Sequence, residues 1–142
     1  MSPVDPQFEH VVRESFARQG LMVTLGARLD TVAPGSVVIE VPFTAGVSQQ
    51  QGFFHGAVLG AIGDSAGGFA ALTLQPAGSE VVSIEYKINF LKPAVGDLLR
   101  ATGRVLRSGR SVSVSQIDIE AISAGKASLC GVMQATFMRV EV

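Results

Sequence analysis

The sequence predicts an α+β fold in which a mostly antiparallel sheet wraps around one long, central, buried helix. Three observations lead to this prediction. Several runs place an apolar residue at every second position, one uncharged stretch is too long for a strand, and a short amphipathic segment precedes both. At 142 residues the chain has a length that one domain covers, and we expect residues 1–142 to form a single domain.

The N-terminal segment predicts a short helix. Asp5-Pro6 has the form of an N-cap followed by proline in the first turn, and Gly20 is a typical stop. Between them, apolar residues recur at helical spacing, namely Phe8, Val11, Val12 and Phe16. This helix therefore has one apolar stripe with which it can pack onto the rest of the chain.

Two runs after this helix predict a β-hairpin. Residues 21–29 and residues 37–43 both alternate apolar with other side chains, and Ala33-Pro34-Gly35 separates them. The polar, glycine-containing residues 44–52 then predict a loop.

Residues 56–74 predict the central helix, because they are small or apolar on nearly every side. The stretch 57–74, with Asp64 as its single charged residue, also raises the question of a membrane span. Asp64 near its middle and several glycines favour a buried helix of a soluble protein, since a carboxylate at the centre of a bilayer is costly. We therefore expect a cytoplasmic protein with no membrane partner.

The rest of the chain predicts about four strands. In the first, the even-numbered residues from Val82 to Phe90 share one face, and Ser83 lies on the opposite, polar face. Further strands are predicted near residues 99–105, 112–119 and 129–137. Within 112–119 the apolar residues switch from even to odd positions, which predicts a bulge near Ser115.

The composition excludes several classes of partner. The net charge of −1 gives no reason to expect nucleic acid or an anionic membrane, and a single cysteine, Cys130, excludes an internal disulfide and a cysteine-based zinc site. Charged residues make up 16% of the chain, against a typical share of about 25%. We therefore expect some apolar surface to be buried against a second copy of the chain.

Asp64 is the leading candidate for a catalytic residue. It is the single charged residue between Glu40 and Glu80, and it falls on the helix expected to be most buried. Burying an ionised carboxylate without a partner is costly, and perturbed carboxylates concentrate at active sites. The alternative is a structural carboxylate that reaches a subunit interface and bonds to backbone donors.

His55-Gly56 forms a second candidate at the start of the same helix. The first N–H groups of a helix lack internal partners and attract negative charge, and glycine lets a substrate oxygen approach the backbone. This end could bind the oxyanion of an acyl-transfer reaction. The alternative is an ordinary cap, with His55 as a polar residue and Gly56 as a turn residue.

The spacing of the two candidates predicts a shared site. Gly56 and Asp64 are eight residues apart, or roughly 12 Å along a helix axis. Asp64 is therefore too far away to act on a substrate bound at the N-terminus of its own helix. In a two-fold dimer with antiparallel helices, each Asp64 could lie near the partner's Gly56.

The motif around these residues resembles the hot-dog-fold acyl-CoA thioesterases of the phenylacetate-degradation (PaaI) type, which are related to hydroxybenzoyl-CoA thioesterases. The matching segments run from Gln49 through His55-Gly56-Ala57 to Asp64, and from Ser83 to Ala94. Ala57 stands where the family usually has a second glycine after the histidine, and Gln49 stands where it more commonly has asparagine.

The resemblance implies hydrolysis of an aryl- or medium-chain acyl-CoA, with coenzyme A as part of the substrate and no further cofactor or metal. It implies that Asp64 is the general base or the nucleophile, a choice that the sequence leaves open. The other implied roles are an oxyanion N–H for Gly56, a loop and carbonyl contact for His55, thioester binding for Gln49 and water orientation for Ser83. It also implies a homodimer with shared active sites, assembled as a dimer of dimers.

Two other functions remain open at this point. A non-catalytic module that binds acyl-CoA or a small ligand would use the same fold and pocket. An enoyl-CoA hydratase of the same fold is disfavoured, since the residues His55 and Asp64 are nine apart rather than close together in one loop.

Overall fold

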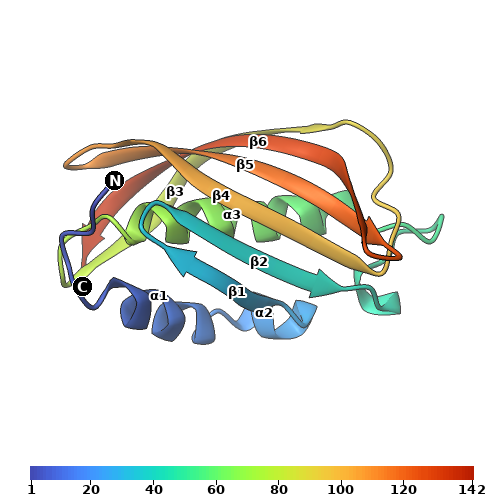
Figure 1. Ribbon diagram of the computed structural model, residues 1–142, viewed down its shortest axis with the longest axis horizontal. Helices are drawn as coiled ribbons and strands as arrows, with labels where there is room; N and C mark the ends of the chain where they lie inside the picture. The colour runs from blue at the N-terminus through green and yellow to red at the C-terminus, as the bar shows by residue number, and fades with distance from the viewer.

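Six antiparallel strands form one curved sheet in the order β1-β2-β4-β5-β6-β3. The computed structural model describes all residues, 1–142, and Figure 1 shows the sheet curling over a central helix. The strands are β1 (Arg28–Ala33), β2 (Ser36–Pro42), β3 (Ser79–Phe90), β4 (Leu98–Ser108), β5 (Val112–Ser123) and β6 (Lys126–Glu141). The predicted α+β architecture is confirmed, with the helix inserted between β2 and β3 in the chain.

Helix α3 (Gly56–Leu72) lies in the concave face of the sheet and is the centre of the core. Its apolar residues, such as Leu59 and Ile62, join strand residues in one cluster of 27 buried side chains. A glycine in β4, Gly103, lets the sheet approach closely, because a Cβ there would lie 2.5 Å from the carbonyl oxygen of Ala66. The helix begins at the predicted residue and ends two residues earlier than expected.

The N-terminal segment forms two helices instead of a helix and a strand. Helix α1 (Phe8–Ala17) lies where it was predicted, but its N-cap is Gln7 instead of Asp5, and it ends before Gly20. Residues 21–25, expected in a strand, belong to helix α2 (Gly20–Leu25). The alternation in this segment was misleading, since Met22 is 2% exposed whereas Val23 is 71% exposed. Gly26, with φ of 70°, ends α2 in the left-handed conformation, and the first strand starts only at Arg28.

A bulge in β3 corrects the predicted faces of this strand. Ser83 pairs with Phe137 and Glu85 pairs with Thr136, so Ile84 is an extra residue. The bulge puts Ser83 on the helix side together with Tyr86 and Phe90, while Val82 lies on the opposite face. The prediction that the even-numbered residues from Val82 to Phe90 share one face is therefore wrong. Side chains alternate between the two faces before Ile84 and again after it, but the bulge breaks the alternation at Ile84.

The bulge expected near Ser115 lies on the neighbouring strand. Val105 pairs with Ser115 and Arg107 with Val114, so the extra residue is Leu106 of β4. In strand β5 the alternation of buried and less buried residues is unbroken from Ser113 to Ile119, because Ser113 and Ser115 are buried on the same face as Ile117 and Ile119. The buried hydroxyl of Ser115 donates to the carbonyl of Gly67, which explains a polar side chain at that position.

Helix α3 is covered on the sheet side and partly open on the other. Ala57 is exposed, and Asp64 and Ser65 are half-buried. The expectation that a fully buried helix encloses Asp64 is therefore wrong for a single chain. None of the helices combines the length and hydropathy that a membrane span requires.

Candidate active site

The first turn of α3 has one backbone donor without a partner. His55 is the N-cap, and its Nδ1 accepts a hydrogen bond of 2.9 Å from the N–H of Ala57. Val58 N–H donates to the carbonyl of His55, whereas the N–H of Gly56 has no acceptor within the chain. His55 is therefore a helix cap, as the alternative interpretation predicted. This cap leaves the Gly56 N–H available to a ligand.

The loop before α3 is held together by Gln49. Its Oε1 accepts from the backbone N–H of Gln51 and from that of Phe53, and its Nε2 donates to Oε1 of Gln51. Gly52, with φ of +85°, makes the turn between them possible. Both polar ends of the Gln49 side chain are therefore engaged inside the loop in a single chain.

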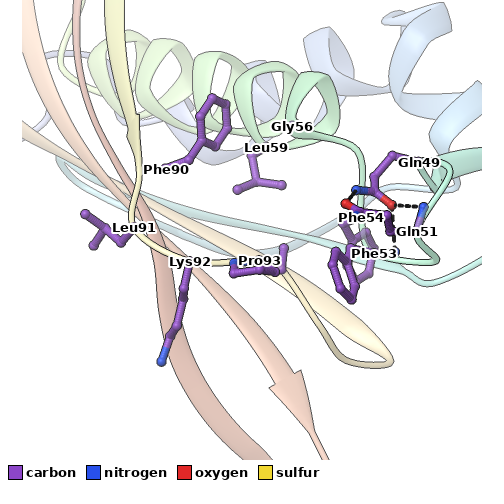
Figure 2. Close-up of a pocket in the computed structure, with 11 residues that line it drawn as sticks. Gln49, Gln51, Phe53, Phe54, Gly56, Leu59, Phe90, Leu91, Lys92 and Pro93 are labelled. Atoms are coloured by element: carbon purple, nitrogen blue, oxygen red, sulfur yellow. Dashed lines mark hydrogen bonds between the residues drawn. The ribbon is translucent and has the colours of Figure 1, made fainter.

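A cavity of about 370 Å³ is lined in part by Gly56, the first residue of α3. Figure 2 shows Leu59 projecting into it and Lys92 projecting away from it at the mouth. Gln49 and Gln51 supply polar groups, and the remaining wall is mainly apolar: Phe53, Phe54, Phe90, Leu91, Pro93 and Ala94. A largely apolar cavity lined by a residue with a free N–H donor suits a mostly apolar ligand that carries a carbonyl oxygen.

Aromatic side chains of β3 cover the glycines of α3. The Phe90 ring lies so close that a Cβ at Gly56 would be 3.1 Å from it, and a Cβ at Gly60 would be 2.9 Å from the Tyr86 hydroxyl. Any larger residue at position 56 would press against the Phe90 ring. Glycine at this position therefore lets the Phe90 ring pack closely against the start of α3.

Asp64 lies two turns further along the same face of α3, beside Ser83. The Ser83 hydroxyl donates to Oδ1 of Asp64 over 2.7 Å. Both residues line a smaller cavity, of about 70 Å³, together with side chains from α1, the α1–α2 junction, α3 and β6. The structure thus brings together Asp64 and Ser83, two of the predicted residues, through the bulge at Ile84.

Asp64 differs from the other inward-lying carboxylates in having no cationic partner. Glu40 is 2% exposed and forms ion pairs with Arg28 and Arg100 across neighbouring strands. The hydrogen bond from Arg28 to Glu40 raises the pKa of that guanidinium, which keeps the pair charged. Asp64 forms no ion pair, so its carboxylate is free to interact with a ligand.

The predicted site residues fall into two separate groups in one chain. Gln49 and Gly56 line the larger cavity and Asp64 and Ser83 the smaller one, while the exposed His55 caps the helix between the loop and α3. The spacing argument also predicts that one chain keeps Asp64 away from its own Gly56. A single chain therefore holds the predicted site residues in two separate groups, called the two half-sites below.

Several residues at these cavities were not anticipated from the sequence. Phe90 and Tyr86 were expected only as strand residues, and Ser15, Gln19 and Glu80 had no expected role. The bulge that orients β3 has no marker in the sequence. The closeness of the N-terminal helices to Asp64 could not be inferred, since residues 20–25 were expected to form a strand.

Comparison with known proteins agrees with this geometry. A crystal structure of a thioesterase family protein from Silicibacter pomeroyi is 37% identical, covers 95% of this chain and 99% of its own, and superposes with a TM-score of 0.93. A 1,4-dihydroxy-2-naphthoyl-CoA hydrolase from Listeria monocytogenes is 30% identical over 102 residues, covering 70% of this chain and 81% of the relative.

The fold is also that of the PaaI protein from the phenylacetic acid degradation operon of E. coli. That structure is 21% identical, covers 94% of each chain and superposes with a TM-score of 0.82, a similarity of fold. The family profile of the thioesterase superfamily matches residues 51–128, which include Gly56, Asp64 and Ser83. The chain is therefore an enzyme of the thioesterase superfamily.

Proposed function

We propose that this enzyme hydrolyses the thioester of an aryl- or medium-chain acyl-CoA to the free acid and coenzyme A. The observation that carries the proposal is that Gly56, whose N–H has no partner in the chain, lines a largely apolar cavity in a thioesterase-superfamily chain. The relative from Listeria monocytogenes is named as a hydrolase of an aromatic acyl-CoA, 1,4-dihydroxy-2-naphthoyl-CoA, and this name supports the proposal. Coenzyme A enters as part of the substrate, and the proposed chemistry uses no other cofactor.

The complete site is proposed to form in a two-fold homodimer, and two such dimers would assemble as a dimer of dimers. One chain would supply Gly56, His55 and Gln49, and the other would supply Asp64 and Ser83. Support comes from the half-sites described above, since a carboxylate and an oxyanion donor on one helix are too far apart to act together. An antiparallel copy of α3 would set the partner's Gly56 beside Asp64.

Strand β3 offers the surface for this pairing. It is the edge of the sheet, is 12 residues long, contains no proline, and leaves Val82, Ile84 and Tyr86 between 44% and 52% exposed. A long apolar edge of this kind is normally paired or covered. Antiparallel pairing of two β3 strands near Tyr86 would also place Ser83 beside Phe90 of the partner subunit, consistent with the arrangement proposed for the helices.

Two chemical routes fit this geometry. In the first, Asp64 takes a proton from water as the water oxygen bonds to the thioester carbon; the C–S bond then breaks, and the CoA thiolate recovers a proton. In the second, an Asp64 oxygen bonds to the carbon and expels CoA thiolate, and water then hydrolyses the resulting anhydride. In both, the N–H of Gly56 would stabilise the negative charge on the carbonyl oxygen.

The remaining residues would support this reaction. Ser83 would orient Asp64 through the hydrogen bond that it donates, or share the attacking water. His55 would hold the first turn of α3 so that the Gly56 N–H faces the substrate, with Nε2 free to contact the carbonyl. Gln49 would fix the loop and would contact the thioester only by releasing its bond to Gln51.

The experiment that tests the proposal measures CoA thiol release from a panel of acyl-CoAs, aromatic to long-chain, with a thiol-reactive disulfide reagent. Wild type is compared with Asp64→Ala, which should lose nearly all turnover while keeping its circular-dichroism spectrum. If Asp64→Ala releases CoA at near-normal rates, Asp64 is not the catalytic carboxylate. A parallel assay for loss of the enoyl chromophore distinguishes a hydratase from a thioesterase. Saturable binding of acyl-CoA without release of the CoA thiol would instead indicate a binding module.

A further inference from the structure

The cavity beside Asp64 is small and unusually polar for a pocket beneath a helix. Its polar lining comes from three parts of the chain: Ser15 and Gln19 at the end of α1, Asp64 and Ser65 on α3, and Glu80 and Ser83 on β3. Gly68, Phe69, Val81 and Phe137 complete it. Its volume of about 70 Å³, against about 370 Å³ for the cavity at Gly56, has room for only the end of an acyl group.

The three hydroxyl groups in this cavity donate to neighbouring side chains. Ser83 donates to Oδ1 of Asp64 over 2.7 Å. Ser15, which is 8% exposed, donates to Oε2 of Glu80 over 2.7 Å, and Ser65 donates to Oε1 of Gln19 over 2.9 Å. These bonds tie the N-terminal helices to α3 and to β3 around the cavity.

Two side-chain groups of residues that line this cavity have no hydrogen-bond partner in the chain. The amide Nε2 of Gln19 has no acceptor in the chain, because the hydrogen bond from Ser65 engages only its oxygen. Glu80 accepts from Ser15 and from Arg18 with Oε2 alone, so its Oε1 has no donor. The side chains that carry this free donor and this free acceptor, Gln19 and Glu80, thus line the same small cavity.

We propose that this space is the subsite for the far end of the acyl group, and that Gln19 is its specificity-determining residue. A terminal hydroxyl would accept from Nε2 of Gln19 and donate to Oε1 of Glu80, so that both unused groups gain a partner. A terminal methyl group would leave them desolvated and unpaired. The inference rests on the proposed thioesterase function and predicts selection for acyl groups that end in a hydroxyl over those that end in a methyl.

The test compares matched acyl-CoAs that differ only at the far end. One set contains ω-hydroxyacyl-CoAs of several chain lengths and their counterparts with a methyl in place of the hydroxyl. The other contains para-hydroxyphenylacetyl-CoA and para-methylphenylacetyl-CoA. At the best-fitting length, wild type should show a kcat/KM ratio of hydroxyl to methyl substrate well above about 10, because a site built to hydrogen-bond its substrate discriminates by up to about 10⁴–10⁵-fold.

The Gln19→Met variant keeps the size of the side chain and removes both amide hydrogen-bonding groups. The hydroxyl-to-methyl ratio should fall to near unity, through a lower rate for the hydroxyl substrate and an equal or higher rate for the methyl substrate. Gln7→Met, at an exposed glutamine just before α1, is the matched control and should keep the wild-type ratio. If Gln19→Met fails to fold, Gln19→Glu retains the acceptor for Ser65 and tests loss of the donor.

The outcomes separate this inference from the proposed function. If wild type hydrolyses both members of each pair equally, or if Gln19→Met keeps the wild-type ratio, the subsite is wrong and the thioesterase proposal stands. Equal loss of both rates in a folded Gln19→Met variant would make Gln19 structural and would overturn its role in specificity. Absence of CoA release from every substrate would reject the proposed function itself.

Discussion

At the residue scale, the surroundings of Asp64 set what its carboxylate can do. Ser83 donates to one carboxylate oxygen, no cation pairs with Asp64, and the residue lines the small cavity. A carboxylate held in this way can take a proton from water or attack a carbonyl carbon. The bulge at Ile84 is responsible, because without it Ser83 would point to the outer face of the sheet.

Replacing Asp64 by asparagine tests this carboxylate with almost no change in volume. We expect kcat for CoA release to fall by about 10²–10⁴-fold, the contribution typical of a general base, with an unchanged melting temperature. Ser83→Ala should lower kcat by a smaller factor, about tenfold, because in the proposed mechanism the serine acts through Asp64 rather than on the substrate. Steady-state kinetics with a shared acyl-CoA check both, and a larger loss for Ser83→Ala than for Asp64→Asn would reverse the assigned roles.

Cys130 illustrates a titratable residue that burial makes inert. It is fully buried, its Sγ lies 3.4 Å from the carbonyl oxygen of Ile119, and desolvation raises the pKa of its thiol. We expect no reaction with a thiol reagent in the native protein and stoichiometric reaction in denaturant, so the CoA-release assay has no background from the enzyme. Rapid labelling of folded protein near neutral pH would contradict this burial.

The raised pKa of Cys130 also has a consequence for stability. The folded state holds the thiol neutral above the pH at which the unfolded thiol ionises, so this contribution is complete below the unfolded pKa. It is lost as the pH rises through the folded value. Chemical denaturation of wild type and Cys130→Ala at neutral and alkaline pH checks the sign: stability should fall more steeply with pH in wild type.

At the element scale, the close approach of α3 to the sheet depends on glycines. Gly103 of β4 faces the backbone of Ala66 and Gly67, which cannot move aside as a side chain could. On the other side of the helix, Gly56 and Gly60 accommodate the rings of Phe90 and Tyr86. The helix is therefore positioned between β4 and β3 by backbone contact, which fixes where Gly56 and Asp64 lie.

Gly103→Ala is expected to destabilise the protein by at least about 1–3 kcal/mol, the usual cost of overpacking a core. The physical reason is that the new Cβ would lie 2.5 Å from the Ala66 carbonyl oxygen. Gly20→Ala at the start of α2 is the matched control, since a Cβ at that position would have no neighbouring atom within 4 Å, and it should be neutral or slightly stabilising. Urea denaturation of both variants measures the difference in their free energies of unfolding. Equal stabilities of the two variants would contradict the close contact between α3 and β4.

At the scale of the whole molecule, each chain contains two incomplete half-sites and an unpaired, partly apolar edge strand. Two-fold pairing along β3 would cover the edge and would create two identical sites at once. The low share of charged residues is consistent with such a buried interface. The proposed dimer would therefore complete the proposed sites and cover the exposed strand.

Mixing two inactive variants tests whether the sites are shared. Asp64→Asn removes the carboxylate, and Gly56→Val obstructs the oxyanion donor next to Phe90. Co-refolded or co-expressed, the two should recover about a quarter of the wild-type activity, since about half of the dimers are mixed and each mixed dimer keeps one intact site. No recovery in mixtures proven to be heterodimeric by mass spectrometry would place both residues in one subunit's site.

Much of this architecture could be predicted from the sequence. The run of small and apolar residues after His55 identifies α3, since no other segment is both long and uncharged. Period-two patterns identify β2 and the four later strands, and the isolated charge at Asp64 directs attention to the site. Eight residues of helix between Gly56 and Asp64 are enough to predict that one chain keeps them apart. These features are local, so short-range patterns contain them.

Other features were decided only by the tertiary structure. The helical conformation of residues 20–25 follows from burying Met22 against the core, which overrides an alternating pattern that also fits a strand. The bulge at Ile84 arises from the pairing of β3 with β6, and it alone turns Ser83 toward Asp64. The contacts of Gln19 with Ser65 and of Ser15 with Glu80 join residues more than 40 positions apart. Such contacts depend on how the elements pack, and local sequence patterns contain no record of packing.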